Sequence, residues 1–298
     1  MSRTTAPSRS LPCTNHRSAA TQHRAAAASI TQLPSDTALV SRADYVLSIV
    51  PPRDARATAA RIVAALGAAD RTAKQSPLYF VELNAVAPSS ARAMAAAFAP
   101  LGDAVRVVDG GIIGGPPAAG GAGEAWARPS VVLSGRYALA AAPRDGARLA
   151  AVLNARHVGD DVGVASGVKC CFAALSKGFT ALAVQAFATA EALGVREELE
   201  FQVGGRQSGQ LERAQRSIVG MAPKAGRWVE EMREIGRAFA EEGGWDRENV
   251  FERIAEVYTA VSEDTVLGQE KVEARTRGTT YGDAVSAIRE GLDSRRKT

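Results

Sequence analysis

Lys169 is the residue whose sequence surroundings most favour chemistry. It lies in the run Ser166-Gly-Val-Lys-Cys-Cys-Phe-Ala-Ala-Leu-Ser-Lys-Gly178, where its nearest neighbours are small or apolar. The apolar periodicity places it in the first turn of a long helix, where burial and the helix dipole would lower its pKa and suit it to accept a proton from an alcohol. Lys177 follows two turns later on a similar face, as a candidate substrate ligand. The alternative is that Lys169 is an ordinary solvated surface charge.

The segment Ser48-Ile-Val-Pro-Pro52 ends a predicted strand. Ligands of open α/β sheets bind just outside the carboxyl ends of the strands. Val50, Pro51 and Pro52 are therefore candidate contacts of a nicotinamide ring. A pair of prolines is equally a plain strand terminator.

A glycine-rich segment, Asp109-Gly-Gly-Ile-Ile-Gly-Gly-Pro116, follows a predicted strand at 105–109. Its spacing does not match the dinucleotide fingerprint G-x-G-x-x-G, and no helix opens directly after it. We expect instead a loop that lets substrate approach the backbone at Gly110, Gly111, Gly114 and Gly115. A flexible surface connection is the alternative.

The beginning of the chain supplies a fourth candidate. Asn15, Arg17 and Ser18 resemble the polar residues that follow the second strand of NADP-binding sheets, where a guanidinium binds the 2′-phosphate. An ordinary polar tail is the alternative. Residues 1–29 are rich in Arg, Ser and Ala and contain no acid, as in a mitochondrial transit peptide. We favour a truncated start of a folded unit, which predicts a cytoplasmic protein, with a mitochondrial location as the alternative.

Composition narrows the functional classes. The chain has 298 residues and a net charge of +4, which equals the four arginines of residues 1–29, so the remainder is neutral and no nucleic-acid surface is expected. The sequence contains no long uninterrupted apolar run, so we predict no membrane span. The three cysteines have neither disulfide-framework nor zinc-ligand spacing, and we expect no metal.

Hydrophobic periodicity predicts an α/β architecture followed by an all-helical half. Strands at 45–50, 78–83, 105–109 and 130–134 alternate with helices at 52–70, 88–101 and 144–154, which is typical of a mostly parallel, Rossmann-like sheet. A long helix at 167–194 follows, then helical segments at 209–221, 224–243, 247–262 and 281–293, separated in part by Gly204-Gly205 and Gly243-Gly244. We predict domains at 1–163 and 164–298.

Taken in order, these stretches resemble the β-hydroxyacid dehydrogenases, which include 6-phosphogluconate and 3-hydroxyisobutyrate dehydrogenases. The resemblance covers about residues 13–265. It rests on Val50-Pro51-Pro52, on Glu82-Leu-Asn-Ala-Val-Ala-Pro-Ser89, on the glycine-rich segment and on the start of the long helix. In that helix Lys169 matches the catalytic lysine of the family. The segment 222–235 resembles the helical domain of a poorly characterised branch. The resemblance implies NADP, or NAD, as cofactor, a small hydroxy acid as substrate, Asn84 among the substrate contacts, and a homodimer.

The chain also departs from the family pattern. Ile113 replaces the serine of the substrate loop, and Ala173 replaces the asparagine four residues after the catalytic lysine. No glycine precedes Asn15, so the first strand and glycine turn of the family are missing, and the strands beside that central strand would lose a partner. These departures leave a second hypothesis open, in which the protein is a non-catalytic relative that binds a ligand or dimerises.

Overall fold

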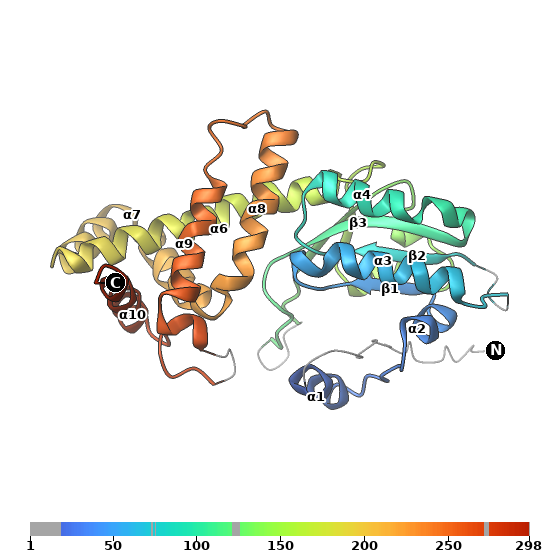
Figure 1. Ribbon diagram of the computed structural model, residues 1–298, viewed down its shortest axis with the longest axis horizontal. Coiled ribbons are helices and arrows are strands. Elements are labelled where there is room, and N and C mark those ends of the chain that lie inside the picture. The colour runs from blue at the N-terminus through green and yellow to red at the C-terminus, as the bar shows by residue number, and fades with distance from the viewer. Residues whose placement is uncertain (1–18, 73, 75, 121–125, 271–273, 298) are drawn as a thin grey trace. The chain divides into compact units, whose positions relative to one another are not determined.

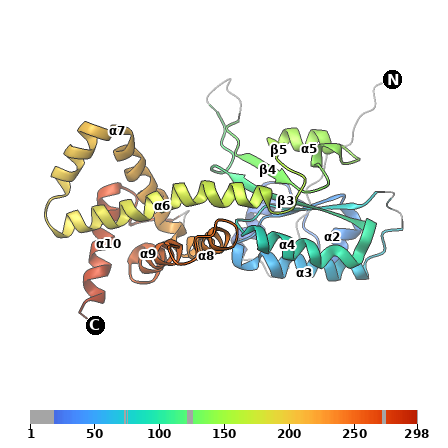
Figure 2. The same ribbon diagram turned by 90° about the horizontal axis from the view of Figure 1, so that it is seen from above.

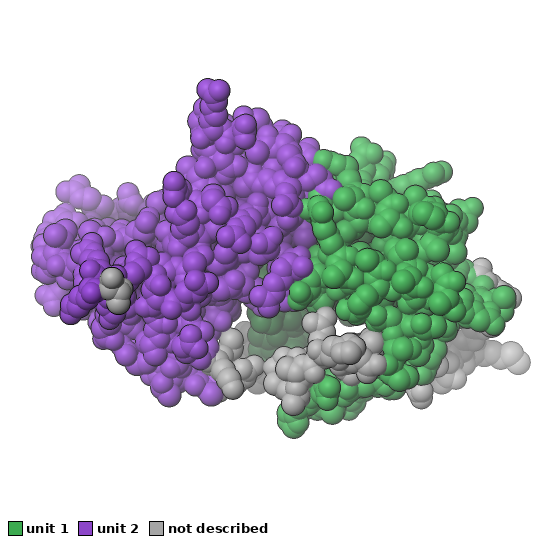
Figure 3. Space-filling model, in the orientation of Figure 1, with its two compact units in different colours: residues 1–50, 54–84, 90–166 green, residues 51–53, 85–89, 167–298 purple. Residues whose placement is uncertain are grey.

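The chain forms two compact units in the computed structural model, which describes residues 19–72, 74, 76–120, 126–270 and 274–297 (Figure 3). Unit 1 comprises residues 1–50, 54–84 and 90–166, and unit 2 comprises residues 51–53, 85–89 and 167–298. The division along the chain falls after Ser166, where the sequence predicts a boundary after residue 163. Asn15, Arg17 and Ser18 lie outside the described residues.

Unit 1 is built on a five-stranded sheet whose spatial order, β1-β2-β3-β4-β5, follows the chain. Its strands are β1 (Tyr45–Ser48), β2 (Leu78–Glu82), β3 (Val105–Ile113), β4 (Ser130–Ser134) and β5 (Ala155–His157). All neighbouring pairs are parallel except β3 and β4, which pair antiparallel with Asp109 opposite Ser134. This confirms the predicted mostly parallel sheet. Among the described residues β1 has only one neighbouring strand, β2, so it is an edge strand.

Helices cover both faces of this sheet (Figures 1 and 2). α3 (Pro52–Ala68) and α4 (Pro88–Phe98) lie on one face and α5 (Gly146–Val152) on the other. Alternate residues of β2 point to opposite faces: Phe80 stacks on Phe98 of α4 at 4.6 Å between ring centroids, while Tyr79 joins the cluster under α5. The sheet is therefore buried on both sides, as a parallel sheet requires.

Several elements of unit 1 differ from the prediction. α1 (Ala19–Ala27), α2 (Asp36–Arg42) and the short β5 were not predicted. β3 is longer than predicted: it runs through Gly110 and Gly111 to Ile113, because this segment pairs with β4. The expectation of a loop beginning at Gly110 is therefore wrong, and the connection between the two strands begins at Gly114.

Unit 2 is all-helical. Its helices are α6 (Val164–Ala192, which begins in unit 1), α7 (Arg196–Met221), α8 (Ala225–Glu241), α9 (Phe251–Glu263) and α10 (Tyr281–Arg295). Short 3₁₀ segments lie at Ala99–Ala104 and Leu139–Ala141 in unit 1, and at Ala222–Lys224 and Val266–Gln269 in unit 2. The predicted break near Gly204-Gly205 lies two residues too early: α7 is helical through both glycines and is kinked at Gln207, whose φ of −148° and ψ of 55° are not helical.

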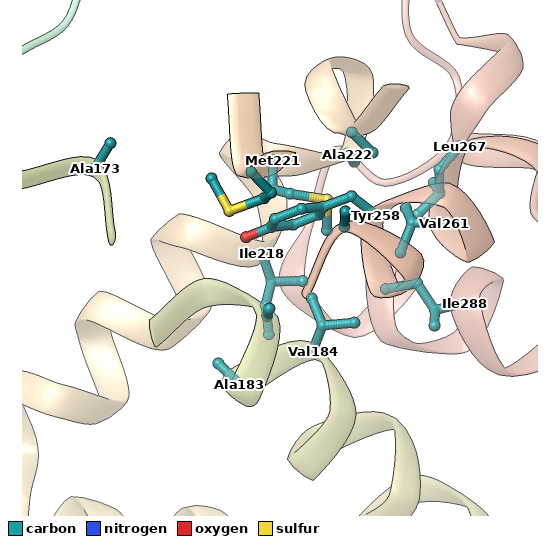
Figure 4. Packing of buried hydrophobic residues seen from close by; sticks show 14 of the residues in the cluster. Ala173, Ala183, Val184, Ile218, Met221, Ala222, Tyr258, Val261, Leu267 and Ile288 are labelled. Atoms are coloured by element: carbon teal, nitrogen blue, oxygen red, sulfur yellow. The ribbon is translucent and has the colours of Figure 1, made fainter. Parts of the chain in front are cut away.

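The core of unit 2 is assembled around Tyr258 (Figure 4). Its ring is fully buried among apolar side chains of α6, α7 and α9, including Val184, Ile218 and Met221. Trp228 of α8 meets it edge-on, at 5.2 Å between ring centroids. The hydroxyl of Tyr258 donates to the carbonyl oxygen of Lys177 at 2.5 Å, so this deeply buried polar atom is satisfied.

α6 is the one helix among the described residues that is long and apolar enough to cross a membrane by length and composition, although the sequence was expected to contain none. Of its most apolar window of 18 residues, 44% is buried within the structure. Ala173, Ala181 and Phe187 of α6 belong to the core of unit 2. Core helices of water-soluble folds have this character too, so the finding is weak evidence for a membrane span.

Candidate functional site

In unit 1, Asn84 fixes the loop that follows β1. Its side-chain oxygen accepts the N–H of Val50 at 2.6 Å, and its amide nitrogen donates to the hydroxyl of Ser48 at 3.0 Å. Asn84 itself is buried, with 3% of its surface exposed. The structure thus brings together two predicted site residues, Asn84 and Val50, at the carboxyl ends of adjacent parallel strands.

The surface of this loop is apolar. Ile49 is 59% exposed, and Val50, Pro51 and Pro52 are partly buried. Since Pro51 and Pro52 have no amide hydrogen, the N–H of Val50 is the last donor before α3. The hydrogen bond from Val50 to Asn84 therefore holds the loop, since the two prolines that follow cannot donate a backbone hydrogen bond.

Glu82, the last residue of β2, lies at the base of the same network. Glu82 was not among the residues predicted to form the site. Its Oε1 accepts the N–H of Asn84 at 2.8 Å, whereas Oε2 is buried and has no hydrogen-bond partner among the described residues. Burial raises the pKa of Glu82 to about 7, against the opposing effect of the hydrogen bonds from Asn84 and Ser48. An acidic residue ending a wholly buried strand was the signal in the sequence that could have identified it.

Asp109 holds the start of α6 against the sheet within unit 1. Its Oδ2 accepts the N–H groups of Gly163 at 2.9 Å and Ser166 at 3.1 Å, and the hydroxyl of Ser134 at 3.0 Å. The Ser166 hydroxyl donates to Oδ1. Carboxylates are favoured at helix N-termini, where free N–H groups and the dipole attract negative charge. Asp109, predicted as the first residue of a substrate loop, is thus a buried anchor of this helix.

The four predicted glycines fall into two environments. Gly110 and Gly111 are buried inside β3, and a Cβ on Gly110 would lie 2.7 Å from the side chain of Leu133. Gly114 and Gly115 are exposed, and Gly114 has a φ of +117°, which glycine adopts readily. Only the second pair lies in the connection that follows β3.

Lys169 lies in the second turn of α6, because the helix begins at Val164, three residues earlier than predicted. Its side chain is partly buried rather than fully solvated. Ala173, one turn later, is 1% exposed and belongs to the core of unit 2, so the position that departs from the family pattern carries no polar group.

Lys177 is engaged within unit 2. Its ammonium forms an ion pair with Glu231 of α8 and lies 5.1 Å from the ring centre of Trp228. Burial lowers the pKa of Lys177, and the pairing with Glu231 opposes that shift. Its predicted contact with substrate would compete with this ion pair.

Two buried residues of unit 2, Glu234 and Cys170, hold the segment 85–89. Oε2 of Glu234 on α8 accepts the N–H of Ala87 at 2.7 Å, and the thiol of Cys170 on α6 donates to the carbonyl oxygen of Val86 at 3.4 Å. No sequence pattern indicates this role of Glu234, because the hydrogen bond joins two residues that are 147 positions apart. No group of three His, Cys, Asp or Glu residues that could hold a metal ion occurs in the described part of the chain.

One family model matches part of the chain. Residues 190–261 match the family model called Domain of unknown function (DUF1932). No curated protein sequence matches.

Several solved structures share the fold. A conserved hypothetical protein from Sinorhizobium meliloti 1021 is 23% identical, with a TM-score of 0.58 over 96% of this chain and 89% of that chain. Mycobacterium tuberculosis 3-hydroxyisobutyrate dehydrogenase with L-serine is 17% identical, with a TM-score of 0.57 over 91% and 88%. Psf3 in complex with NADP+ and 2-OPP is 17% identical, with a TM-score of 0.53 over 83% and 84%.

The chain therefore has the fold of 3-hydroxyisobutyrate dehydrogenases, a Rossmann-like sheet followed by a helical half. The resemblance predicted from the sequence is confirmed at this level.

Proposed function

We propose that this protein is an NADP-linked oxidoreductase that oxidises a small hydroxy acid, with Lys169 as the proton acceptor. The observation that carries the proposal is the placement of Lys169, partly buried in the second turn of a helix whose start Asp109 holds in place. A proton acceptor needs a fixed position more than any other property, because proton transfer requires hydrogen-bond reach of the reacting hydroxyl.

The reaction removes two hydrogens from an alcohol carbon. When bound, NADP+ would supply the hydride acceptor for that carbon, and Val50, Pro51 and Pro52 would hold its ring. The neutral amine of Lys169 takes the hydroxyl proton, so the alcohol becomes a carbonyl and Lys169 becomes an ammonium. The exposed connection at Gly114 and Gly115 is one proposed substrate contact. The other is the second amide hydrogen of Asn84, since its oxygen and its first amide hydrogen already bind Val50 and Ser48.

The loop after β1 suits the nicotinamide end of the cofactor. It offers an apolar surface at Ile49 and Val50, and its backbone is held by Asn84. Val50, Pro51 and Pro52 are the residues proposed to hold the ring. Asn15, Arg17 and Ser18 are proposed for the 2′-phosphate. NAD is the alternative cofactor.

A titration with NADPH followed by a screen of small hydroxy acids for NADPH formation tests this proposal. In the active reaction, Lys169→Met should lower kcat by about 10²–10⁴-fold while the Kd for NADPH changes less than about twofold. Lys297→Met, which removes an exposed lysine near the C-terminus, is the matched control. Unchanged kcat in Lys169→Met would contradict the role of Lys169.

A second candidate function is a non-catalytic relative that binds a ligand or dimerises. The burial of Ala173 in the core of unit 2 favours it, because no polar side chain stands at that position to bind substrate. Micromolar NADPH binding without turnover of any hydroxy acid would support this candidate. Turnover by the purified chain would eliminate it.

We also propose that the chain forms a homodimer through α6. Large apolar side chains recur along one face of this helix and are exposed: Val168 at 40%, Phe172 at 46%, Leu175 at 77% and Leu182 at 64%. Their spacing of three, four and seven residues places them in one stripe. An open apolar groove lined by Ala186, Ala190, Leu193 and Leu199 follows toward the start of α7. Apolar surface of this kind is usually covered by a partner.

The oligomeric state tests this part of the proposal. We expect light scattering to give twice the chain mass for the wild type and the chain mass for a Leu175→Glu, Leu182→Glu variant. Trp245→Glu is the matched control, because Trp245 is 55% exposed but lies outside α6. A monomeric wild type, or binding of lipid vesicles through this face, would contradict the dimer.

A further inference from the structure

Glu82 is a buried acid that the proposed reaction does not use. It ends a strand in which all five residues are buried, and only 2% of its own surface is exposed. In the described part of the chain no basic side chain forms an ion pair with it, and its Oε2 has no hydrogen-bond partner. Burying an acid without an ion-pair partner lowers the stability of the fold, so we expect its contacts to serve a role.

The contacts of Glu82 lead to the loop after β1. Its Oε1 accepts the N–H of Asn84, and Asn84 in turn accepts the N–H of Val50 and donates to Ser48. The backbone also links the two strands here, through the N–H of Leu83 and the carbonyl oxygen of Ser48 at 3.0 Å. The carboxyl group of Glu82 thus fixes the bend at 82–84 that directs the amide of Asn84 toward Val50.

We propose that Glu82 is a positioning residue for cofactor binding: through Asn84 it holds Val50, and with it the loop that receives the nicotinamide ring. The proposal rests on the function proposed above. Glu82 acts without touching the cofactor, because its side chain is buried and its Oε1 binds the backbone of Asn84.

The chemistry of the carboxyl group fits this role. Burial raises the pKa of Glu82 to about 7, and the charge of Asp109 on the neighbouring strand β3 adds to the increase. Both the protonated and the ionised carboxyl group offer an acceptor to Asn84, so the contact does not depend on the charge of Glu82. Glutamine would supply the same acceptor in the same place, whereas leucine would supply none.

The test compares Glu82→Leu and Glu82→Gln with the wild type by amide hydrogen exchange at Val50 and by titration with NADPH. Because Pro51 and Pro52 carry no amide hydrogen, a peptide spanning the loop reports few amides besides that of Val50. In Glu82→Leu we expect exchange at Val50 to rise at least about tenfold and the Kd for NADPH to rise by about the same factor. Glu82→Gln should restore both to near the wild-type values.

Glu234→Leu is the matched control. Glu234 is a buried glutamate of unit 2 that likewise accepts a backbone N–H, that of Ala87, so its loss should speed exchange at Ala87 and leave Val50 unchanged. This comparison separates positioning by Glu82 from general loosening of the fold.

The outcomes distinguish the two proposals. Unchanged exchange at Val50 in folded Glu82→Leu would overturn the inference, and so would faster exchange with an unchanged Kd. If the wild type itself does not bind NADPH while Val50 loosens only in Glu82→Leu, the coupling between Glu82 and the loop stands and the proposed function fails. Failure of Glu82→Gln to restore exchange would show that side-chain volume, not the hydrogen bond, controls the loop, and would also overturn the inference.

Discussion

Lys177 of α6 and Glu231 of α8 form an ion pair inside unit 2, with 12% and 8% of their side chains exposed. Both charged groups are buried away from water, and the charge of each is neutralised chiefly by that of the other. Removing one partner leaves an unpaired buried charge, whereas removing both does not.

This asymmetry gives the first prediction. Lys177→Met and Glu231→Met should each lower the free energy of unfolding by about 3–5 kcal/mol, and the double variant should recover most of that loss. Urea unfolding of the four proteins measures the coupling. Additive losses in the double variant would show that the two side chains do not depend on each other.

Replacement of Asp109 should loosen the start of α6. Asp109→Asn removes the negative charge that faces the start of the helix and puts an NH₂ group in place of one carboxylate oxygen, so we expect a loss of about 2–4 kcal/mol in unfolding free energy. Amide exchange at Gly163 and Ser166 should increase as well. Asp103→Asn, whose side chain is 94% exposed in the wild type, should leave both measurements unchanged.

Glu82 should make stability depend on pH. Its folded-state pKa of about 7 lies above its ordinary value of 4.5, so the folded protein holds a proton that the unfolded chain releases between these values. Stability should therefore fall as the pH rises through this window, by up to about 3 kcal/mol, and stay level above it. Glu82→Gln should abolish this component, so the difference between the two unfolding curves, measured from pH 4 to 8, isolates it from other titrating groups. A constant difference across that range would contradict the raised pKa.

The adjacent cysteines should differ in reactivity. Cys170 is buried, and burial raises the pKa of its thiol to about 12, with Glu234 adding to the effect, whereas Cys171 is exposed. Because the thiolate is the reactive form, iodoacetamide should label Cys171 rapidly and Cys170 only after unfolding. Mass spectrometry of a Cys13→Ser protein checks this, and equal labelling of both in the folded state would be inconsistent with the packing of α6.

Gly110 should tolerate no side chain. A Cβ there would lie 2.7 Å from the side chain of Leu133, 2.8 Å from that of Leu83 and 3.0 Å from the carbonyl oxygen of Glu82. We expect Gly110→Ala to lower the unfolding free energy by about 1–3 kcal/mol. In Gly115→Ala, where nothing lies within 4 Å, thermal unfolding should match the wild type.

Local sequence patterns predicted most of the fold. The apolar runs at 45–50, 78–83 and 130–134 predicted strands that the structure confirms, and the long apolar period after Gly167 predicted α6. These elements are predictable because their burial repeats with the period of a strand or a helix. Gly110 and Gly111 suggested a loop instead, because glycine usually ends a strand, and only the pairing of β3 with β4 shows why it does not do so here.

The candidate site was predicted in part. The run Val50-Pro51-Pro52 and Asn84 each follow a strand, so their positions at the strand ends could be inferred. The hydrogen bond between Val50 and Asn84 could not, and neither could the roles of Glu82, Asp109 and Glu234, since each depends on residues distant in the chain. Lys177 illustrates the reverse case: its face of α6 was predicted, but its partner Glu231 belongs to another helix.

The order of strands in the sheet bears on how unit 1 folds. Each strand pairs with the strand that precedes it in the chain, so the sheet can grow from β1 to β5 in the order in which the ribosome releases the segments. Closing the sheet one neighbour at a time keeps each loop short and its entropic cost small. The bonds from Gly163 and Ser166 to Asp109 can form only after β4 and β5 have left the ribosome, so the start of α6 is anchored after the last strand of the sheet has been made.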